Sequence, residues 1–411
     1  PSMQQASEFK QHIHFVHYSD GTLKLYNLIP EDVIVKNVLF NGNPIPIQET
    51  LIPGYLSNPK PTIIKTAFIG IQDEMFTIST EYKGFNATSK NYITVLLDDI
   101  NNPLLLDTGN EFEFIEAIDE NVYEVKVGSW TIDKPIILDG DLIILPGTNL
   151  EFEKNTYIII KGSLTAIGEE SNPITLKSKI DYWDGLYVVN ANKKSYIKNV
   201  NISNTSSIDD GLLNLSGSIT FYKSDAELEN VRINNVKAED AINIVNSTFS
   251  LDSIFIKNTF SDGLDSDFSS GKVLNSMFSN IGGDALDFSG SNVVITDTSA
   301  SNVQDKAVSA GEGSELNIEN SHFNNIGIGV ASKDGSSVIL SNSSIFDSKL
   351  YSTMSYIKKD FYEPPKIIII NTNMSKSNAH IRQKGTYMLV DGTEIPESEI
   401  NVDKIYNLGK E

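Results

Sequence analysis

The tetrapeptide Asp240-Ala-Ile-Asn243 is followed by four related tetrapeptides, each 22 residues further along the chain. All of them keep the small second position and the aliphatic third position: Asp262-Gly-Leu-Asp265, Asp284-Ala-Leu-Asp287, Lys306-Ala-Val-Ser309 and Ile328-Gly-Val-Ala331. Self-similarity at a fixed period is the signature of a repeat architecture, in which each unit packs only on its neighbours. Short β-branched runs and the lack of a 3.6-residue apolar period argue against helical repeats.

Two series of turn-forming residues run in step with this repeat. They are Asn235, Asn258, Asn280, Asn302, Asn325 and Asp347, and Asn230, Ser253, Asn275, Asp297, Asn320 and Asn342. Asn and Asp tolerate unusual backbone angles, and an Asn amide reaches the equivalent residue of the next coil when coils stack about 4.8 Å apart. We therefore predict an all-β fold, a right-handed parallel β-helix with coils of about 22 residues.

The remaining sequence divides around this repeat. Residues 1–122 predict a β-rich, β-sandwich-like N-terminal domain, since Leu23 and Leu25 alternate with polar residues and Val33–Val35 is a β-branched run. The β-helix is placed at residues 123–374, with segment 206–226 as a loop insertion and Ile367–Asn371 as its closing strand. Residues 375–411 are expected to form a C-terminal cap, because a solenoid must cover its open edge.

Charge and composition restrict the possible partners. The chain carries 54 acidic and 32 basic residues, a formal net charge of -22, and only two arginines, Arg232 and Arg382. Nucleic acid is therefore not an expected partner, because phosphate binding needs clustered Lys and Arg. The lack of cysteine excludes disulfides and thiol catalysis. No transmembrane segment is predicted, and no signal peptide opens the chain, so we expect any leader to have been removed.

The early coils resemble the opening coils of bacterial right-handed parallel β-helix proteins of the pectate-lyase-like superfamily. Three segments carry this resemblance: Gly162-Ser-Leu-Thr-Ala-Ile-Gly168, Asn172-Pro-Ile174 and Trp183-Asp-Gly-Leu186. The repeat itself is similar to β-helix proteins of bacterial surfaces. The resemblance implies a polysaccharide partner and a secreted or cell-surface location. It leaves open whether the protein is an enzyme, since the superfamily holds lyases, hydrolases, epimerases and non-catalytic proteins.

The repeat also gathers carboxylates. Coil stacking places Asp265 beneath Asp287 and Asp262 beneath Asp284, at about 4.8 Å. Stacked like charges are unfavourable unless a cation bridges them or one carboxyl is protonated. Three interpretations remain open. The stacks hold Ca²⁺ through Asp262, Asp265, Asp284 and Asp287; or they perform acid–base chemistry; or they are turn residues that accept backbone N–H groups.

The catalytic hypothesis assigns Asp265, Asp267 and Asp287 to glycan cleavage. A carboxyl pair about 5 Å apart suits retention, and one of about 6.5 Å or more suits inversion. Lys306, one coil beyond Asp284, is a candidate proton acceptor for a lyase reaction. The alternative for Lys306 is an Asp–Lys ladder that relieves the stacked charge.

Three further residues are candidates for substrate binding: Trp183, Tyr187 and Lys333. The two aromatic side chains would stack on sugar rings, and the alternative for them is packing. His12, His14 and His17 form a weaker candidate for a transition-metal site, and His322 is expected near a surface turn.

The leading functional hypothesis is a secreted or surface β-helix that binds a polysaccharide and assists its modification, export or anchoring. One alternative is a polysaccharide lyase or glycoside hydrolase that acts on an acidic glycan through the Asp262–Asp287 patch. Another is a structural or adhesive spacer, whose Asn ladders and acidic stacks serve only the fold. Ca²⁺, held by the acidic stacks, is the cofactor that the sequence suggests.

Overall fold

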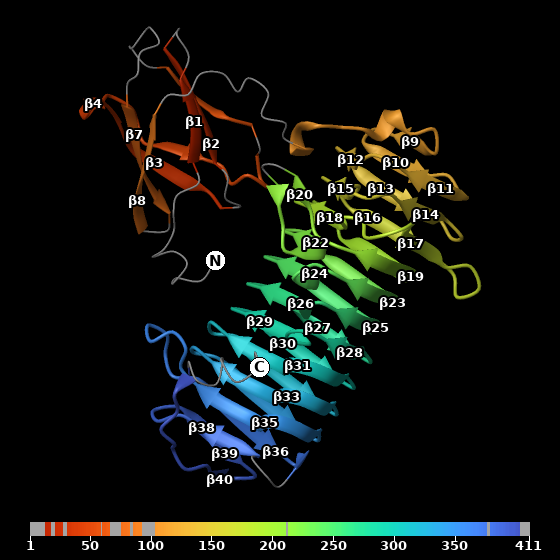
Figure 1. The fold of residues 1–411 in the computed structure, drawn as a ribbon, viewed down its shortest axis with the longest axis vertical. Helices are drawn as coiled ribbons and strands as arrows, with labels where there is room; N and C mark the ends of the chain where they lie inside the picture. Colours follow the sequence, from red (N-terminus) through yellow and green to blue (C-terminus); the bar gives the residue numbers. More distant parts are fainter. Residues whose placement is uncertain are drawn as a thin grey trace. The chain divides into compact units, whose positions relative to one another are not determined.

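The structure is a computed structural model that describes residues 13–17, 21–27, 31–58, 60–65, 75–82, 85–92, 103–210, 213–375 and 379–402. The chain forms two compact units, residues 1–106 with 210–213 and residues 107–209 with 214–411 (Figure 1). Strands make up 63% of the structure and helix only 2%, so the predicted all-β class is confirmed. The helical residues form two short 3-10 helices, Pro103–Leu105 and Gly109–Glu111.

The N-terminal unit contains two antiparallel sheets over one buried core, as the β-sandwich-like prediction requires. One sheet has three strands: β1 (Ile13–His17), β2 (Thr22–Asn27) and β6 (Thr62–Lys65). The other has five: β3 (Val33–Phe40), β4 (Asn43–Ile45), β5 (Thr50–Ile52), β7 (Met75–Tyr82) and β8 (Phe85–Tyr92). Leu23 and Leu25 of the first sheet share a core with Val33, Val35 and Ile78 of the second.

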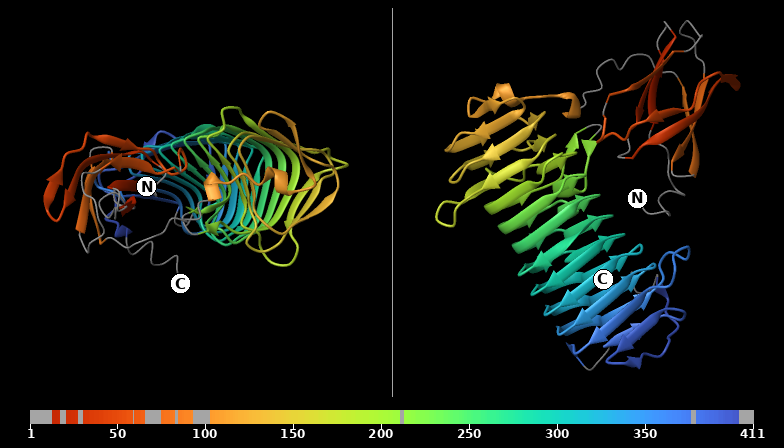
Figure 2. Two further views of the ribbon diagram at one scale, coloured as in Figure 1. Left: turned by 90° about the horizontal axis from the view of Figure 1, so that it is seen from above. Right: turned by 180° about the vertical axis from the view of Figure 1, so that it is seen from behind.

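The second unit is a right-handed parallel β-helix of about 11 turns, with coils of about 23 residues. Its coils lie behind one another when the stack is viewed from one end (Figure 2). Each coil contributes a strand to three parallel faces. Face 1 contains β12 (Ile136–Leu138), β15 (Ile158–Ile160), β18 (Leu186–Val189), β22 (Gly217–Tyr222), β24 (Asp240–Val245), β26 (Asp262–Asp267), β29 (Leu286–Ser289), β38 (His380–Arg382) and the second halves of β31 (Ser299–Gly311), β33 (His322–Lys333) and β35 (Ser344–Tyr356).

Faces 2 and 3 are built in the same way. Face 2 contains β10 (Val122–Val125), β13 (Asp141–Ile144), β16 (Leu164–Ile167), β27 (Ser270–Leu274), β30 (Asn292–Thr296), β32 (Glu315–Glu319), β34 (Ser337–Ser341), β36 (Lys366–Ile370), β39 (Tyr387–Val390) and the first halves of β19 (Ser195–Thr205), β23 (Ala226–Val236) and β25 (Thr248–Thr259). Face 3 contains β11 (Ser129–Ile132), β14 (Asn149–Phe152), β17 (Ile174–Ser178), β28 (Met277–Ile281), β37 (Asn373–Met374), the second halves of β19, β23 and β25, and the first halves of β31, β33 and β35.

Four short strands lie outside these faces. β9 (Ile115–Asp119) and β40 (Thr393–Glu394) pair antiparallel with β10 and β39, respectively. β20 (Asp209–Asp210) and β21 (Leu213–Asn214) pair with each other.

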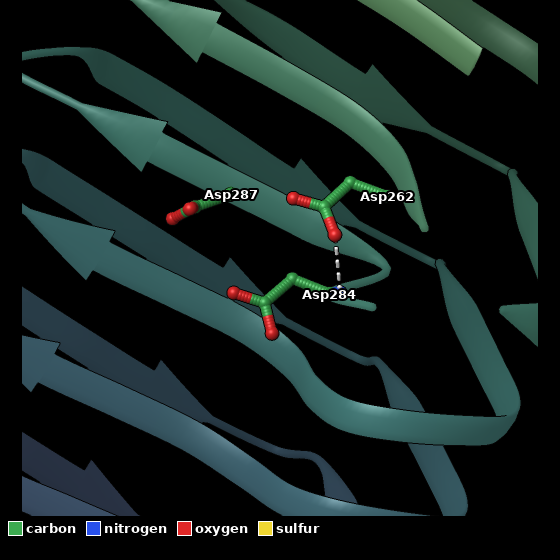
Figure 3. Close-up of side chains that lie close together, drawn as sticks. All are labelled: Asp262, Asp284 and Asp287. Carbon is green, nitrogen blue, oxygen red and sulfur yellow. Dashed lines mark hydrogen bonds between the residues drawn. The ribbon is translucent and has the colours of Figure 1, made fainter. Parts of the chain in front are cut away.

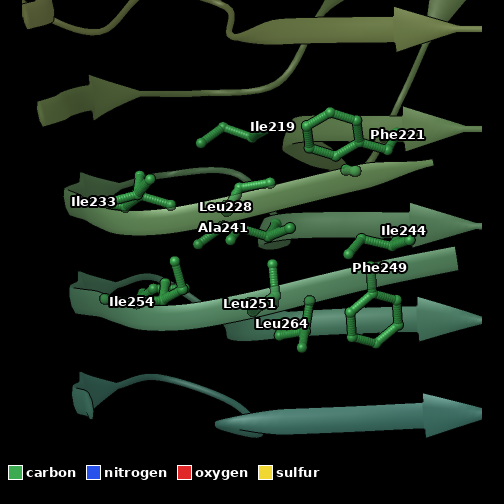
Figure 4. Close-up of a cluster of buried hydrophobic side chains, with 14 of the residues drawn as sticks. Ile219, Phe221, Leu228, Ile233, Ala241, Ile244, Phe249, Leu251, Ile254 and Leu264 are labelled. Carbon is green, nitrogen blue, oxygen red and sulfur yellow. The ribbon is translucent and has the colours of Figure 1, made fainter. Parts of the chain in front are cut away.

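The predicted register is confirmed by the strand pairing of face 1. Ile242 pairs with Leu264, Leu264 with Leu286, and the column continues to Val308 and Val330. All five side chains are fully buried. Apolar side chains from the three faces interdigitate inside the coils, as Figure 4 shows for Ile219, Phe221, Leu228, Ile233, Ala241, Ile244, Phe249, Leu251, Ile254 and Leu264.

The turns between faces 2 and 3, and those after face 3, are made by the two predicted series. All twelve members have positive φ angles, as the left-handed turn conformation requires. Amide groups link the coils: Asn280 donates to Asn258, Asn302 to Asn280, and Asn325 to Asn302, at 2.7–2.9 Å.

A second ladder, of buried serines, stands at the turns between faces 1 and 2. The backbone N–H of each serine except the last donates to the hydroxyl group of the equivalent serine one coil later, at 2.8–3.2 Å. The members are Ser224, Ser247, Ser269, Ser291, Ser314 and Ser336.

The structure differs from the prediction at both ends of the regular repeat. Segment 206–226 is not wholly a loop, because β22 pairs with β18 and β24 as a face 1 strand. The step from Leu186 to its partner Ile219 is 33 residues, which hides the period. The closing strand was also predicted too early: β36 pairs onward with β39, and β35 with β38. The proposed domain start at residue 123 falls within β10.

Candidate functional site

The outward side of face 1 carries a cluster of titratable side chains across five coils. We call it the acidic face; its members are Asp240, Asn243, Asp262, Asp265, Asp267, Asp284, Asp287, Lys306, Ser309 and Lys333. Asp265, Asp267 and Asp287 point outward because they alternate with core residues such as Leu264 and Ser266. Strand pairing stacks Asn243, Asp265, Asp287 and Ser309 in one column.

Three carboxylates converge at the centre of the acidic face (Figure 3). One oxygen each from Asp262, Asp284 and Asp287 lies within 4.8 Å of the others. Asp262 Oδ1 accepts hydrogen bonds from the Asp284 backbone N–H, at 2.8 Å, and from the Ser261 hydroxyl, at 3.1 Å. These bonds hold the Asp262 carboxylate toward Asp287.

Whereas Asp284 is buried, Asp287 is a partly buried member of this group. Its Oδ1 atom is buried and accepts no hydrogen bond of normal geometry from the part of the chain that the structure describes. The nearest ammonium nitrogen is Lys333 Nζ, at 3.9 Å. The Lys333 side chain crosses Gly311, where the lack of a Cβ leaves it room. Asp287 is thus a carboxylate whose buried Oδ1 faces the cation of Lys333.

Lys306 is enclosed by carboxylates. Its Nζ lies 3.2 and 3.3 Å from the two oxygens of Asp284 and 2.6 Å from Asp305 Oδ2. The backbone N–H of Lys306 donates to Asp284 Oδ1 at 2.8 Å. Only 3% of the Lys306 side chain is exposed. This geometry matches the Asp–Lys ladder and leaves the ammonium group no route to a substrate.

Burial drives the pKa values of the acidic face apart. Burial, with neighbouring carboxylates, raises the pKa of Asp240 to about 8 and that of Asp262 to about 7. Burial and Asp267 hold the pKa of Asp265 well above its usual range. Burial would also raise the pKa of Asp287, but Lys333 and Lys306 outweigh it and hold that pKa below the ordinary value. Near neutral pH, Asp287 is therefore ionised, while Asp240 and Asp265 retain protons and Asp262 is partly protonated.

These shifts predict that the protein is more stable at mildly acidic than at mildly basic pH. The unfolded chain titrates aspartates near a pKa of about 3.9, whereas folded Asp240 and Asp262 keep protons up to about pH 8 and 7. Between these limits the folded state binds more protons, so the free energy of unfolding falls as pH rises. Thermal melting at about pH 5 and about pH 8 measures this effect.

Asp265→Asn provides the control for this prediction, since the amide does not titrate and should flatten the dependence of melting temperature on pH. A wild-type melting temperature that rises between the two pH values would contradict the prediction.

Three residues of this region were not predicted as site residues. Asn243 donates its amide to Asp240 at 3.3 Å and to Asp265 at 3.2 Å. Asp240 and Asn243 occupy the same repeat positions as Asp262 and Asp265, one coil earlier, so the 22-residue register could have identified them. Lys359 lies in the segment after β35. Its ammonium group donates to the Glu312 carboxylate, and its backbone N–H donates to Asp334 Oδ1 at 2.7 Å. That segment interrupts the repeat, so no sequence signal pointed to it.

Two predicted substrate-binding residues are fully buried. The Trp183 ring stacks on Phe152 at 4.0 Å, and its Nε1 donates to the Ser203 carbonyl at 3.1 Å. The Tyr187 hydroxyl donates to the Asp184 carbonyl and accepts from the Ile208 N–H. Neither ring offers a face to a sugar, because both are 0% exposed. Packing therefore explains both residues.

The sequence indicated four candidate histidines. His12 lies outside the described residues, and so do the side chains of His14 and His17 in β1. His322 is exposed, and its Nδ1 lies 2.9 Å from the Ser344 hydroxyl. A membrane-crossing helix is not found in the described parts of the chain.

Comparisons with known proteins yield similarity of fold alone. No protein-family model matches the chain, and no curated protein matches it. Among solved structures, an alginate lyase from Paenibacillus sp. str. FPU-7 is 12% identical, with 60% of this chain and 92% of that chain covered and a TM-score of 0.35. The periplasmic alginate epimerase AlgG is 12% identical over 75% and 86%, with a TM-score of 0.39.

A third structure, the catalytic unit of the GH87 α-1,3-glucanase from Streptomyces thermodiastaticus, is 10% identical over 92% of this chain and 89% of that chain, with a TM-score of 0.39. At these identities no residue role is transferred to this chain. The acidic face has to be interpreted from its own geometry.

Proposed function

We propose that this protein binds a polysaccharide across its acidic face and hydrolyses it, with Asp287 as the nucleophile and Asp262 as the general acid. The observation that carries the proposal is the pair of opposed pKa shifts in one cluster of carboxylates: upward for Asp262 and downward for Asp287, with oxygens within 4.8 Å. Neighbouring carboxyl groups with separated pKa values divide acid and base roles at one pH. Both side chains are only partly buried, so a glycan has access to them.

The short spacing favours hydrolysis with retention of configuration. Retaining glycosidases hold their carboxyl groups about 5–5.5 Å apart, and inverting enzymes about 6.5–9.5 Å. In the first step, Asp262 gives its proton to the glycosidic oxygen as the bond from that oxygen to the anomeric carbon breaks. A carboxylate oxygen of Asp287 then bonds to this carbon. In the second step, water attacks the same carbon, gives a proton to Asp262 and releases Asp287.

The neighbouring side chains suit glycan binding along the solenoid axis. The column Asn243, Asp265, Asp287 and Ser309 stacks on successive coils about 4.8 Å apart, and a glycan would reach the two partly exposed members, Asp265 and Asp287. Because the pKa of Asp265 is well above its usual range, its carboxyl is protonated near neutral pH and serves as a hydrogen-bond donor to a sugar oxygen. Lys333 keeps Asp287 ionised.

Hydrolysis is favoured over lyase chemistry by the position of Lys306. A lyase needs a base that reaches the proton next to a uronate carboxylate. The Lys306 ammonium group is bonded to Asp284 and Asp305 and only 3% of its side chain is exposed. We therefore assign Lys306 to charge balance within the fold rather than to catalysis.

Calcium binding is the second candidate function, and the convergence of three carboxylate oxygens within 4.8 Å favours it. Ca²⁺ takes six to eight oxygen ligands. Asp284 already shares both oxygens with Lys306, and Asp265 lies outside the trio, so Asp262 and Asp287 are the ligands that remain. Two carboxylates make an incomplete cage, which would need water or glycan oxygens to complete it.

Turnover of a panel of neutral and acidic polysaccharides, measured with Ca²⁺ and again with excess chelator, tests the proposal. We expect new reducing ends in both conditions, and a product whose anomeric configuration by NMR is that of the substrate. An unsaturated product would show a lyase instead, and activity lost in chelator would show a calcium requirement. If no polysaccharide is cleaved in either condition, the hydrolase proposal is wrong.

A glycan array separates the two remaining possibilities. Binding without cleavage would leave a polysaccharide-binding protein, and the absence of binding would leave a structural spacer. The same proposal places the protein outside the cell or at its surface, where extracellular polysaccharides occur.

A further inference from the structure

A groove of about 620 Å³ lies on the outward side of the solenoid where faces 2 and 3 meet, away from the acidic face. It crosses β19, β23 and β25. The side chains that matter for its chemistry are Lys198, Asn201, Glu229, Arg232 and Phe255.

Arg232 is the most unusual residue of this groove. Its side chain is exposed, and its guanidinium carbon lies 4.4 Å from the centre of the Phe255 ring. It has no carboxylate partner within ion-pair distance among the residues that the structure describes. Arg382, in contrast, is buried and pairs with Glu394 and Glu397. Stacking on a ring holds a guanidinium plane in place while its edge remains available to an anion.

The strand register extends the groove into a column of sugar-compatible groups. Asn201 pairs with Arg232, Arg232 with Phe255, and Phe255 with Met277 on successive coils. The Asn201 side chain makes no hydrogen bond to another described residue. Met277 is 49% exposed and adds apolar surface next to the half-buried Phe255 ring. Two donor groups are therefore followed by two apolar side chains at steps of about 4.8 Å along the axis.

The edge of the groove is fixed by an ion pair. Lys198 Nζ lies 2.8 Å from Glu229 Oε1, so each of these side chains neutralises the other. Glu170 also lines the groove but makes no ion pair with Arg232 among the described residues, so the guanidinium group remains available to an anion. A planar guanidinium binds a carboxylate through two parallel hydrogen bonds, which gives specificity as well as affinity.

We propose that this groove is a second glycan-binding site, which takes a sugar that bears a carboxylate. Arg232 pairs with the carboxylate through both edge nitrogens, the Asn201 amide bonds a neighbouring hydroxyl, and the sugar packs against Phe255 and Met277. The site would hold a polysaccharide on faces 2 and 3 of the solenoid. Acidic sugars would be repelled by the carboxylates of the acidic face, which lies on face 1. The inference does not depend on whether the acidic face cleaves its ligand.

The test is calorimetric titration of the full chain with a tetramer of galacturonic acid, and with maltotetraose as the neutral probe. Asp287→Asn is present in all proteins, so that the ligand is not consumed. We expect Arg232→Gln to weaken binding of the acidic tetramer by at least about tenfold, with Arg232→Lys intermediate. Lys366→Gln, an equal loss of charge on face 2, should leave the dissociation constant unchanged.

The proposal is overturned if the acidic tetramer does not bind, if Arg232→Gln binds it as tightly as the parent protein, or if maltotetraose binds equally well. Melting temperatures close to that of the parent protein would show that the variants are folded. A failure here would leave glycan turnover by the acidic face intact, whereas a failure of the hydrolase proposal would leave this binding intact.

Discussion

Asp287→Asn is expected to lower the rate constant for glycan hydrolysis by about 10³-fold or more. The substitution keeps the size of the side chain but removes the negative charge that Lys333 and Lys306 stabilise. It also removes the nucleophile that would bond to the anomeric carbon. A melting temperature close to that of wild type would show that the loss does not come from a disturbed fold, since Asp287 also pairs with Lys333. Release of reducing ends from the polysaccharide identified in the panel measures the effect.

Asp297→Asn is the matched control for this prediction. Asp297 is an exposed turn residue with φ of 50°, a conformation that Asn adopts readily, and it lies away from the acidic face. The same chemical change there should leave turnover unchanged. More than a tenth of the wild-type rate in Asp287→Asn, with the control at full rate, would refute the assignment of Asp287 as nucleophile.

The largest expected effect on stability comes from Lys306→Ala. This change leaves Asp284 buried without its cation, which typically destabilises a protein by about 3–5 kcal/mol. The pKa of Asp284 is already raised to about 6 by burial, against the effect of Lys306, so the lone carboxyl will protonate more readily below that pH. The loss should therefore be larger near pH 8 than near pH 5. Urea unfolding at both pH values provides the free energies.

The double variant Asp284→Asn with Lys306→Met distinguishes charge from packing. The Asn oxygen still accepts the backbone N–H of residue 306, and the other carboxylate partner of Lys306, Asp305, is partly exposed to solvent. Replacement of a buried ion pair by uncharged groups is often neutral, so we expect a stability within about 1 kcal/mol of wild type. If the double variant is as unstable as Lys306→Ala, loss of the Lys306 stem rather than of its charge explains the effect.

The sequence was sufficient to predict the register of the regular coils. A fixed coil length makes stacked positions visible as a period, so the columns of Leu264 and of Asn258 could be identified before any coordinate. Where coils vary in length, as between Leu186 and Ile219, the period vanishes and β22 was mistaken for part of a loop. Strand pairing, and not sequence spacing, then fixes the order.

The candidate site was predicted only in part. Stacking of Asp265 and Asp287 follows from the register alone, but the direction and environment of each side chain do not. Trp183 lies next to a turn, and nothing in its spacing shows that its ring stacks on Phe152 inside the coil. Lys306 and Asp287 are both charged and three coils or fewer from the same aspartates, yet the Lys306 side chain is 3% exposed and that of Asp287 is 24% exposed.

The serine ladder has a direction, and this limits where the solenoid can stop. The backbone N–H of each ladder serine from Ser224 to Ser314 donates to a hydroxyl group that lies one coil later in the chain. A chain cut at any boundary between Ser224 and Ser314 would leave one such donor without its acceptor, at about 1–3 kcal/mol. The N–H of Ser336 instead donates to the Lys333 carbonyl within its own turn. The ladder therefore ends at Ser336, and each coil from Ser224 to Ser314 depends on the next coil for one hydrogen-bond acceptor.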